Sequence, residues 1–291
     1  MNNNNSKSII MVVAAAMLWG TYGSFVTGIS ALGVPANSIV LLRFLATTIP
    51  VFLYLFFTDR EQLRIKKEDI PLFLANGLAS IFFFVYCYTA AIKETKIATA
   101  AALLYTAPAM VMLMSALLFK EKLTRRKVLC ILLAVIGCAF VSGIGSGSAG
   151  LTLRGLLLGL GAAFGYSLYS IFSRCIQQRG YSTFTNIFYT FGTATIAYFI
   201  MATATKTLPK IWPPTPGIGL ALLCGLVTGL GAYALYTTGL EGMEPSRAAQ
   251  LATIEPVFAA ILGVVLFHQT LSITEVAGIV MVVTAVVLMN R

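Results

Sequence analysis

Long apolar runs separated by short polar gaps dominate the pattern of this sequence. A helix needs about 20 apolar residues to cross the hydrocarbon layer of a membrane. The runs predict ten membrane-spanning helices, at residues 8–28, 36–57, 70–91, 97–119, 127–143, 153–173, 182–204, 217–239, 247–268 and 273–290. The gaps between them carry helix-breaking Gly and Pro, most densely at 143–150 and 209–216. We therefore expect an all-α integral membrane protein.

The composition supports a membrane location and excludes a nucleic-acid partner. Hydrophobic residues make up 58% of the chain and charged residues 10%, whereas soluble domains carry about 25% charged residues. The net charge is +10, but the Lys and Arg residues lie in short gaps between apolar runs, which is the positive-inside pattern. The partner expected from composition is the lipid bilayer. The five cysteines lack metal or redox spacing, so no metal or cofactor is expected.

The distribution of Lys and Arg predicts the orientation. Nine of these residues fall in the gaps at 58–69 and 120–127, against two at 92–96. If the first span starts inside, 14 Lys and Arg lie inside, 5 lie outside and Arg43 lies within a span. This bias predicts a multi-pass protein of the inner (cytoplasmic) membrane with both termini in the cytoplasm. The sequence leaves the oligomeric state open.

An internal repeat relates the two halves of the chain. At a shift of 148 positions, residues 72–135 align with residues 220–283 without a gap, with 16 identities in 64 positions. Pro108 aligns with Pro256, and Leu118-Phe119 aligns with Leu266-Phe267. We therefore expect two five-helix repeats, at residues 1–145 and 146–291. Because five is an odd number, the second repeat must cross the membrane upside down. Inverted repeats are typical of secondary transporters, whose substrate site lies between the halves near the midplane.

Several short motifs add a family resemblance. They are Leu18-Trp19-Gly20, Leu42-Arg43-Phe44, Pro108, the run from Leu118 to Thr124, and Glu255-Pro256-Val257. With these motifs in this order, the chain resembles members of the drug/metabolite transporter superfamily, specifically the EamA-type ten-span exporters. The resemblance implies movement of small organic solutes, often amino acids, amines or drugs, and usually outward. One departure is His268-Gln269, where many members of the family have an acid at the end of the ninth span.

Glu255 is the first candidate for the chemistry of a transport site. It is the ninth residue of the span predicted at 247–268, which places it about 12 Å from the inner end, near the midplane. A charge at that depth costs about 3 kcal/mol or more unless it meets water, a partner or a proton. We expect Glu255 to bind a cationic amine or carry a coupling proton. The structural alternative is a pair with Arg43 or with a tyrosine.

Pro256 and Pro108 are expected to kink their helices. Neither has an N–H to donate, so the carbonyl groups of Ala252 and Leu104 are expected to be free at the depth of Glu255. A plain kink and a kink that also contacts the ligand both remain open. Gln250, at the start of the same stretch as Glu255, joins the candidate set.

Arg43 and a set of aromatic residues complete the candidates. Arg43 lies about 9 Å from the outer end of its span. Helix packing is its simplest role, and a substrate carboxylate or a gate pair with Glu255 is the alternative. The aromatic candidates are Trp19, Tyr22, Tyr88, Tyr105, Tyr166, Tyr169, Tyr233 and Tyr236. Three pairs of them are spaced by three residues and share a helix face. Packing explains any single one, but the set suits apolar, aromatic or cationic solutes.

These features favour one function over its competitors. An enzyme would need a catalytic cluster, and the chain has a single His and no GxSxG motif. ATP-driven transport would need a GxxxxGK[ST] motif, which is absent. We therefore expect a non-enzymatic secondary transporter of amino acids or amines, and the family resemblance implies that it is an exporter. A multidrug exporter of cationic aromatic compounds is the alternative.

Overall fold

The computed structural model describes residues 3–95, 97–142, 152–207 and 216–290, and these residues form helices and no strands. The gap predicted at 143–150, Lys96, and the prolines Pro209, Pro213 and Pro214 lie outside the described residues. The first half contains α1 (Asn3–Gly20), α2 (Tyr22–Ala31), α3 (Ala36–Thr58), η1 (Arg60–Leu63), η2 (Lys67–Asp69), α4 (Ile70–Ala75), η3 (Asn76–Phe82), α5 (Phe83–Glu94), α6 (Ile97–Leu104), α7 (Ala107–Phe119) and α8 (Arg125–Val141). The second half contains α9 (Leu153–Gln178), α10 (Thr183–Ala204), α11 (Pro216–Cys224), η4 (Gly225–Gly231), α12 (Ala232–Glu241), α13 (Pro245–Leu251), α14 (Ile254–Phe267) and α15 (Ile273–Asn290).

Eight helical segments of the described residues are long and apolar enough to cross a membrane, judged by length and composition. They are Ser6–Ala31, Ala36–Thr58, Lys67–Glu94, Thr99–Phe119, Leu153–Gln178, Thr183–Ala204, Pro216–Glu241 and Pro245–Phe267. Each coincides with one of the predicted spans to within a few residues at either end. The other two predictions fall on α8, which has 17 residues, and on α15, whose apolar part is Ile273–Met289. The protein is thus an all-helical, multi-pass membrane protein.

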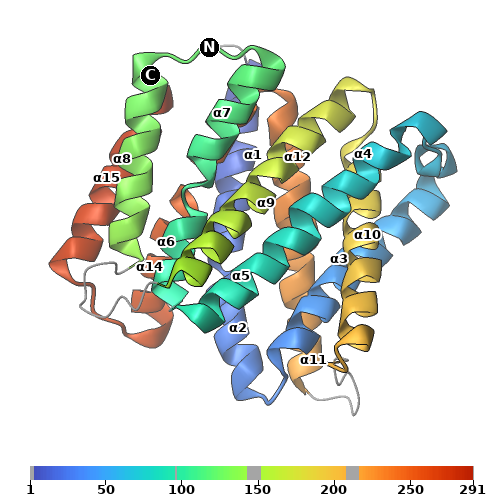
Figure 1. Ribbon diagram of the computed structural model, residues 1–291, viewed down its shortest axis with the longest axis horizontal. Helices are drawn as coiled ribbons and strands as arrows, with labels where there is room; N and C mark the ends of the chain where they lie inside the picture. The colour runs from blue at the N-terminus through green and yellow to red at the C-terminus, as the bar shows by residue number, and fades with distance from the viewer. Residues whose placement is uncertain (1–2, 96, 143–151, 208–215, 291) are drawn as a thin grey trace.

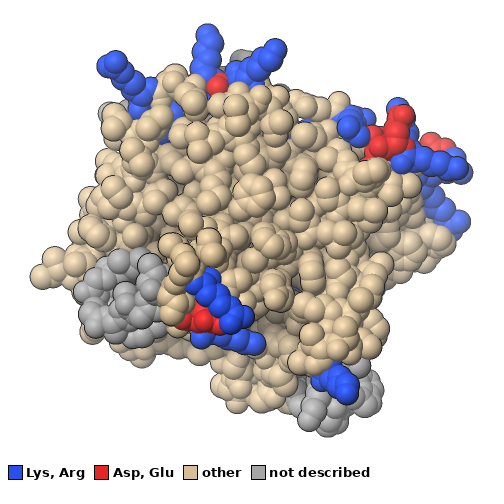
Figure 2. All heavy atoms as spheres, in the orientation of Figure 1, with Lys and Arg blue, Asp and Glu red and all other residues tan. Residues whose placement is uncertain are grey.

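The charged side chains gather at two opposite edges of the molecule. Figure 2 shows Lys, Arg, Asp and Glu along these edges, with an uncharged band between them on the visible face. Figure 1 shows that α1 begins and α15 ends at the same edge, together with the turn between α7 and α8. We call this edge the terminal end and the other the distal end. An uncharged band between charged edges is the surface that a lipid bilayer requires.

Helices of one half pack against helices of the other in reciprocal pairs. The contact of α1 with α12 has a counterpart in α9 with α5, and that of α3 with η4 has one in α10 with η3. Likewise α1 packs on α14, and α9 packs on α7. The counterparts α8 and α15 pack on each other, side by side at one margin of Figure 1. The core of the molecule therefore lies between the two halves.

Two π-helical segments widen the corresponding spans of the two halves. They are η3 and η4, and the shift of 148 residues that relates the repeats brings them within one residue of each other. The turns that follow α7 and α14 also correspond, because Lys120 and His268 both adopt a left-handed conformation, with φ of 56° and 53°. Such details of backbone geometry extend the sequence repeat to local structure.

A buried polar cluster joins η3 to α9 and α10. Asn76 Nδ2 donates to Asn186 Oδ1 at 2.9 Å and to Thr190 Oγ1 at 2.8 Å. Asn186 Nδ2 donates to Ser173 Oγ at 2.9 Å, and Ser80 Oγ donates to Asn76 Oδ1 at 2.8 Å. All five residues are buried. Every amide in the cluster has a partner, so it holds η3 against the second half.

The terminal end is held together by a second polar group, outside the apolar band. Tyr181 donates to Asp69 Oδ2 at 2.5 Å, and Arg179 pairs with the other oxygen of the same carboxylate. The backbone N–H of Lys66 donates to the Tyr181 hydroxyl at 3.0 Å. Burial and the bond to Asp69 raise the pKa of Tyr181, so its phenol stays protonated and donates. This group ties the loop before α4 to the loop after α9.

Candidate functional site

A cavity of about 110 Å³ lies between the two halves in the middle of the molecule. Its walls come from α1, α2, α3, α5, α6 and the break after α6 in the first half, and from α9, α12 and α14 in the second. The lining residues are Trp19, Tyr22, Val40, Arg43, Phe44, Phe84, Val85, Tyr88, Thr89, Leu104, Tyr105, Tyr166, Tyr233 and Glu255. The cavity therefore brings together eight of the residues predicted from the sequence, from seven helices and the break between α6 and α7.

Arg43 is held at the cavity wall by contacts with both halves. Its Nη2 donates to the backbone carbonyl of Thr228 at 3.1 Å, and its Cζ lies 4.7 Å from the centroid of the Tyr22 ring. Its Nε is buried and has no hydrogen-bond partner among the described residues. A guanidinium binds a carboxylate through two parallel N–H groups. Arg43 therefore has an unused donor beside a donor that is already anchored.

The carbonyl of Thr228 also fixes Trp19. The indole Nε1 donates to this oxygen at 3.1 Å, so one carbonyl of η4 accepts from side chains of α1 and α3. A carbonyl oxygen has two lone pairs and can accept twice. Gly225 and Gly229 of η4 permit the approach, because a Cβ at Gly225 would lie 2.9 Å from the Cα of Arg43. The wide π turn thus positions both candidate side chains.

Glu255 enters the cavity from the first turn of α14, directly after a break in the helix. Tyr105 donates to Glu255 Oε1 at a long 3.5 Å, from the corresponding break between α6 and α7. Gly20 lets the end of α1 approach, since a Cβ there would lie 2.9 Å from the carbonyl oxygen of Glu255. The carboxylate is therefore placed by the meeting of α1, α14 and the break between α6 and α7, and it keeps capacity to accept further hydrogen bonds.

The carbonyl of Ala252, expected to be free, has a donor. The backbone N–H of Glu255 donates to it at 3.0 Å, because the chain tightens into a turn before α14. The helix breaks accordingly lie before the prolines, and Pro108 and Pro256 fall within the first turn of the helices that follow. At that position, a proline removes no hydrogen bond. Pro108 borders a small cavity beside the main one, which also touches Tyr105 and Glu255.

Arg43 and Glu255 both line the cavity without forming an ion pair. The ion pairs within 4 Å among the described residues involve other side chains, namely those of Glu94, Asp69, Glu121 and Glu244. The cavity thus presents the guanidinium group of Arg43 on one wall and the carboxyl group of Glu255 on another. Of the alternatives that the sequence leaves open, a direct structural pair between the two is not formed in this conformation.

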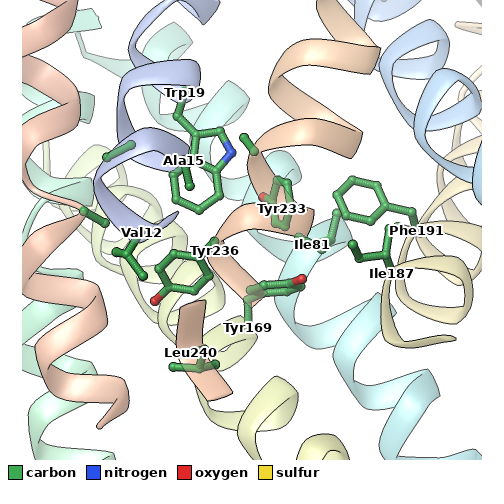
Figure 3. Close-up of a cluster of buried hydrophobic side chains, with 14 of the residues drawn as sticks. Val12, Ala15, Trp19, Ile81, Tyr169, Ile187, Phe191, Tyr233, Tyr236 and Leu240 are labelled. Atoms are coloured by element: carbon green, nitrogen blue, oxygen red, sulfur yellow. The ribbon is translucent and has the colours of Figure 1, made fainter. Parts of the chain in front are cut away.

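An aromatic layer closes the cavity toward the terminal end. Figure 3 shows the rings of Trp19, Tyr233, Tyr236 and Tyr169 gathered in this layer. The Trp19 ring lies 5.1 Å from that of Tyr233 and 5.2 Å from that of Tyr236. The hydroxyl of Tyr236 shares a hydrogen bond with that of Ser170 at 2.7 Å, and Tyr169 does the same with Thr237 at 2.6 Å. Tyr169 and Tyr236 therefore lie behind the cavity wall and seal it.

Gln250 was predicted for the site but does not line the cavity. It is fully buried in α13. Sequence reasoning also missed several lining residues, including Val40, Phe84, Thr89 and Leu104. Phe84 stacks on Tyr88, four residues later on the same helix, so the spacing rule used for the tyrosines would have found it. Nothing in the sequence indicates that the backbone carbonyl of Thr228 accepts hydrogen bonds from Arg43 and Trp19.

The residues at the two sides of the cavity differ in exposure. Thr89 is exposed and lies in the second half of α5, the part of this helix that Figure 1 places toward the distal end. On the other side, the sealing residues Tyr169 and Tyr236 are buried. The lining therefore includes an exposed residue toward the distal end, and buried aromatic residues back the cavity toward the terminal end.

Comparison with known proteins identifies relatives along the whole chain. The profile of the EamA-like transporter family matches residues 6–143 and again residues 153–291. An uncharacterized transporter of Archaeoglobus fulgidus is 29% identical over 96% of this chain and 95% of its own length. The pseudopaline exporter CntI of Pseudomonas aeruginosa is 24% identical over 98% and 96%. A solved crystal structure, 21% identical, matches with a TM-score of 0.82 over 97% of this chain and 96% of the other, which supports the fold.

Proposed function

Because the chain belongs to the EamA-like transporter family, we propose that it is a secondary active exporter of amino acids or amines. In this proposal, the solute crosses the cytoplasmic membrane by alternating access between two inverted five-helix repeats, 1–145 and 146–291. The supporting observation is the cavity between the halves, which holds one base and one acid that are not paired with each other. No part of this mechanism requires a cofactor.

The reciprocal packing of the halves supports the inverted arrangement. The strongest contacts between a first-half helix and the second half have counterparts with the halves exchanged, as for α1–α12 and α9–α5. Such exchange is expected when a two-fold axis relates the repeats. Counting α8 and α15 as spans gives ten, five in each repeat, and five crossings require the second repeat to be inverted. The Lys and Arg bias then places both termini in the cytoplasm.

The residues of the cavity support a zwitterionic or amine solute. Arg43 lines the cavity without an ion-pair partner and can attract a carboxylate, and Glu255 retains acceptor capacity for an ammonium group. The aromatic walls provide apolar contact and attract cations through their faces. Glu255 is also the residue that we propose to carry a coupling proton. The relative that is a pseudopaline exporter supports outward movement.

A multidrug exporter of cationic aromatic compounds is the second candidate. The six rings of Trp19, Tyr22, Tyr88, Tyr105, Tyr166 and Tyr233 around Glu255 favour it. Arg43 opposes it, because a fixed cation in the same cavity repels a ligand that carries only positive charge. The two candidates therefore differ in the effect expected from removing Arg43.

The test is transport in proteoliposomes across a panel of amino acids, amines and cationic dyes, with and without a pH gradient. We expect Glu255→Gln to abolish the response to the gradient, and Arg43→Gln to lower the affinity for amino acids about tenfold or more. Glu94→Gln, at the distal surface, is the matched control. If Arg43→Gln improved the transport of cationic dyes, and neither this variant nor the wild type transported amino acids, the second candidate would replace the first. Transport by Glu255→Gln with an unchanged response to the gradient would contradict proton coupling at this residue.

A further inference from the structure

The closed side of the cavity contains buried polar atoms that have no partner. Among the described residues, six buried side-chain nitrogen and oxygen atoms make no hydrogen bond to the protein, and one of these is Arg43 Nε in the cavity. The other five belong to Ser115 of α7, Glu121 just beyond it, Gln177 at the end of α9 and Gln250 of α13. In Figure 1, α7 and α9 both end at the terminal end. Burying a polar atom without a partner costs free energy, so such groups call for an explanation beyond packing.

Three of these residues lie along one seam, formed by α7 and α13. Ser246 near the start of α13 donates to Glu121 just beyond the end of α7. Three residues further along α13, Ala249 packs against Val111 of α7. The two helices therefore run in opposite directions. Ser115 lies between these two contacts on α7, and Gln250 directly follows the second contact on α13. Both side chains are fully buried.

A group of ion pairs closes the seam at the terminal end of the molecule. Lys127 Nζ lies 2.5 Å from Glu244 Oε2 and 3.5 Å from Glu121 Oε2. Lys127 is in the first turn of α8, and Glu244 immediately precedes α13. The Lys127 side chain is 14% exposed and that of Glu121 is 6% exposed. The Lys127–Glu244 pair links the first half to the second across the seam, and the Lys127–Glu121 pair ties the start of α8 to the residue just beyond α7.

We propose, building on the transport function proposed above, that the α7–α13 seam is the solute route between the cavity and the terminal end. Ser115, Gln250 and Glu121 line this route and contact water and solute when it is open. The Lys127 pairs with Glu121 and Glu244 form its gate. In this proposal, the cavity opens toward the distal end in the present conformation, and the gate is closed.

The proposal accounts for the unpartnered atoms as well as for the closed seam. A solute that enters at one end must leave at the other, and the helices that separate must expose polar groups rather than only apolar ones. Ser115 and Gln250 supply neutral hydrogen-bonding groups along the seam, and both are next to apolar residues that pack in the closed state. The Asn76–Asn186 cluster, whose amides are all paired, lies outside this route and is expected to stay closed.

Cysteine accessibility tests the proposal without reference to transport. The five native cysteines are replaced by alanine or serine, and Ser115→Cys is introduced for labelling by N-ethylmaleimide in proteoliposomes. Ser80→Cys is the matched control, because Ser80 is equally buried but hydrogen-bonded within the Asn76 cluster. We expect the Cys at position 115 to react and the one at 80 to remain unlabelled. Adding Lys127→Gln is expected to raise the labelling rate at 115 about tenfold, the effect of losing a charged hydrogen bond.

Lys122→Gln, in the same loop, is the control for the loss of a charge and is expected to leave the rate unchanged. Equal rates at 115 with and without Lys127→Gln would overturn the gate. Equal labelling at 115 and 80 would overturn the route, because opening would then be general loosening of the bundle. If Ser115→Cys does not yield a monodisperse protein, Gln250→Cys gives the same readout. Amino-acid transport without labelling at either position would reject the route alone, whereas gated labelling without transport of any amino acid would reject only the substrate proposal.

Discussion

Replacing Gly225 by alanine is expected to separate two helices at the point where Arg43 reaches the cavity. Gly225 begins η4 and faces α3. A Cβ there would lie 2.6 Å from the Cβ of Ala46, 2.9 Å from the Cα of Arg43 and 3.1 Å from the Arg43 carbonyl oxygen. These neighbours are backbone atoms or the first side-chain atom, so no rotamer change relieves the clash. Either α3 or η4 must move.

The size of the movement follows from these distances. Carbon atoms in contact lie about 3.5–4.0 Å apart, so the two helices must separate by about 1 Å. The hydrogen bond from Arg43 Nη2 to the Thr228 carbonyl is 3.1 Å long, and adding about 1 Å takes it beyond the hydrogen-bond range. Overpacking costs about 1–3 kcal/mol, and the lost charged hydrogen bond contributes a similar amount. We expect a total of roughly 2–6 kcal/mol.

Thermal unfolding in detergent and binding of an amino acid measure the two consequences. Gly219→Ala is the matched control, because Gly219 lies in the same span, is exposed, and leaves open space around the place that a Cβ would take. We expect Gly219→Ala to keep or raise the Tm, since alanine favours helix over glycine. We expect Gly225→Ala to lower the Tm by several degrees and to weaken binding. Equal Tm and equal Kd for the two variants would refute the claim that close packing at Gly225 positions Arg43.

Three further predictions concern residues that hold the bundle. Asn186→Leu leaves the amide of Asn76 and the hydroxyl of Ser173 buried without this partner; we expect about 2 kcal/mol or more of destabilisation, and a Tm equal to wild type would contradict the cluster's structural role. Trp19→Phe keeps an aromatic ring but loses the hydrogen bond to the Thr228 carbonyl; we expect about 1 kcal/mol by thermal unfolding, with a larger loss in Trp19→Ala as the comparison. Arg126→Gln removes an exposed contact to the Leu288 carbonyl at the end of α15; we expect a Tm within about 2 °C of wild type, and a larger fall would show that α15 depends on this contact.

The spans could be predicted from the sequence because the bilayer requires long apolar runs. The prediction at 36–57 matches α3 (Ala36–Thr58), and that at 182–204 matches α10 (Thr183–Ala204). The spacing of the aromatic residues predicted the cavity lining only in part. Tyr166 and Tyr233 line the cavity, whereas Tyr169 and Tyr236, three residues further along the same helices, lie behind its wall. Trp19 and Tyr22 both line the cavity, but they belong to α1 and α2 and do not share a helix face.

The backbone irregularities could not be predicted in the same way. Nothing in the residues of η3 or η4 distinguishes a π turn from an α turn, and yet η4 supplies the Thr228 carbonyl that anchors Arg43 and Trp19. The proline rule predicted a kink at Pro256, but not that the break precedes it or that the N–H of Glu255 takes the Ala252 carbonyl. Such features depend on how neighbouring helices pack against one another. The pattern of residues along one helix carries no information about that packing.

The charges of the cavity break the symmetry of the repeat that surrounds them. The shift of 148 residues places Ala107 opposite Glu255. Gly77 faces Thr190 as its counterpart Gly225 faces Arg43, so neither charge has a charged counterpart in the other half. The first half supplies the base and the second supplies the acid, although their helices pack in reciprocal pairs. A zwitterion can satisfy both charges in one orientation only. If the halves exchange roles during alternating access, the solute keeps its carboxylate on the first half and its ammonium group on the second. The solute then has the same orientation relative to the two halves when the cavity opens to either side of the membrane.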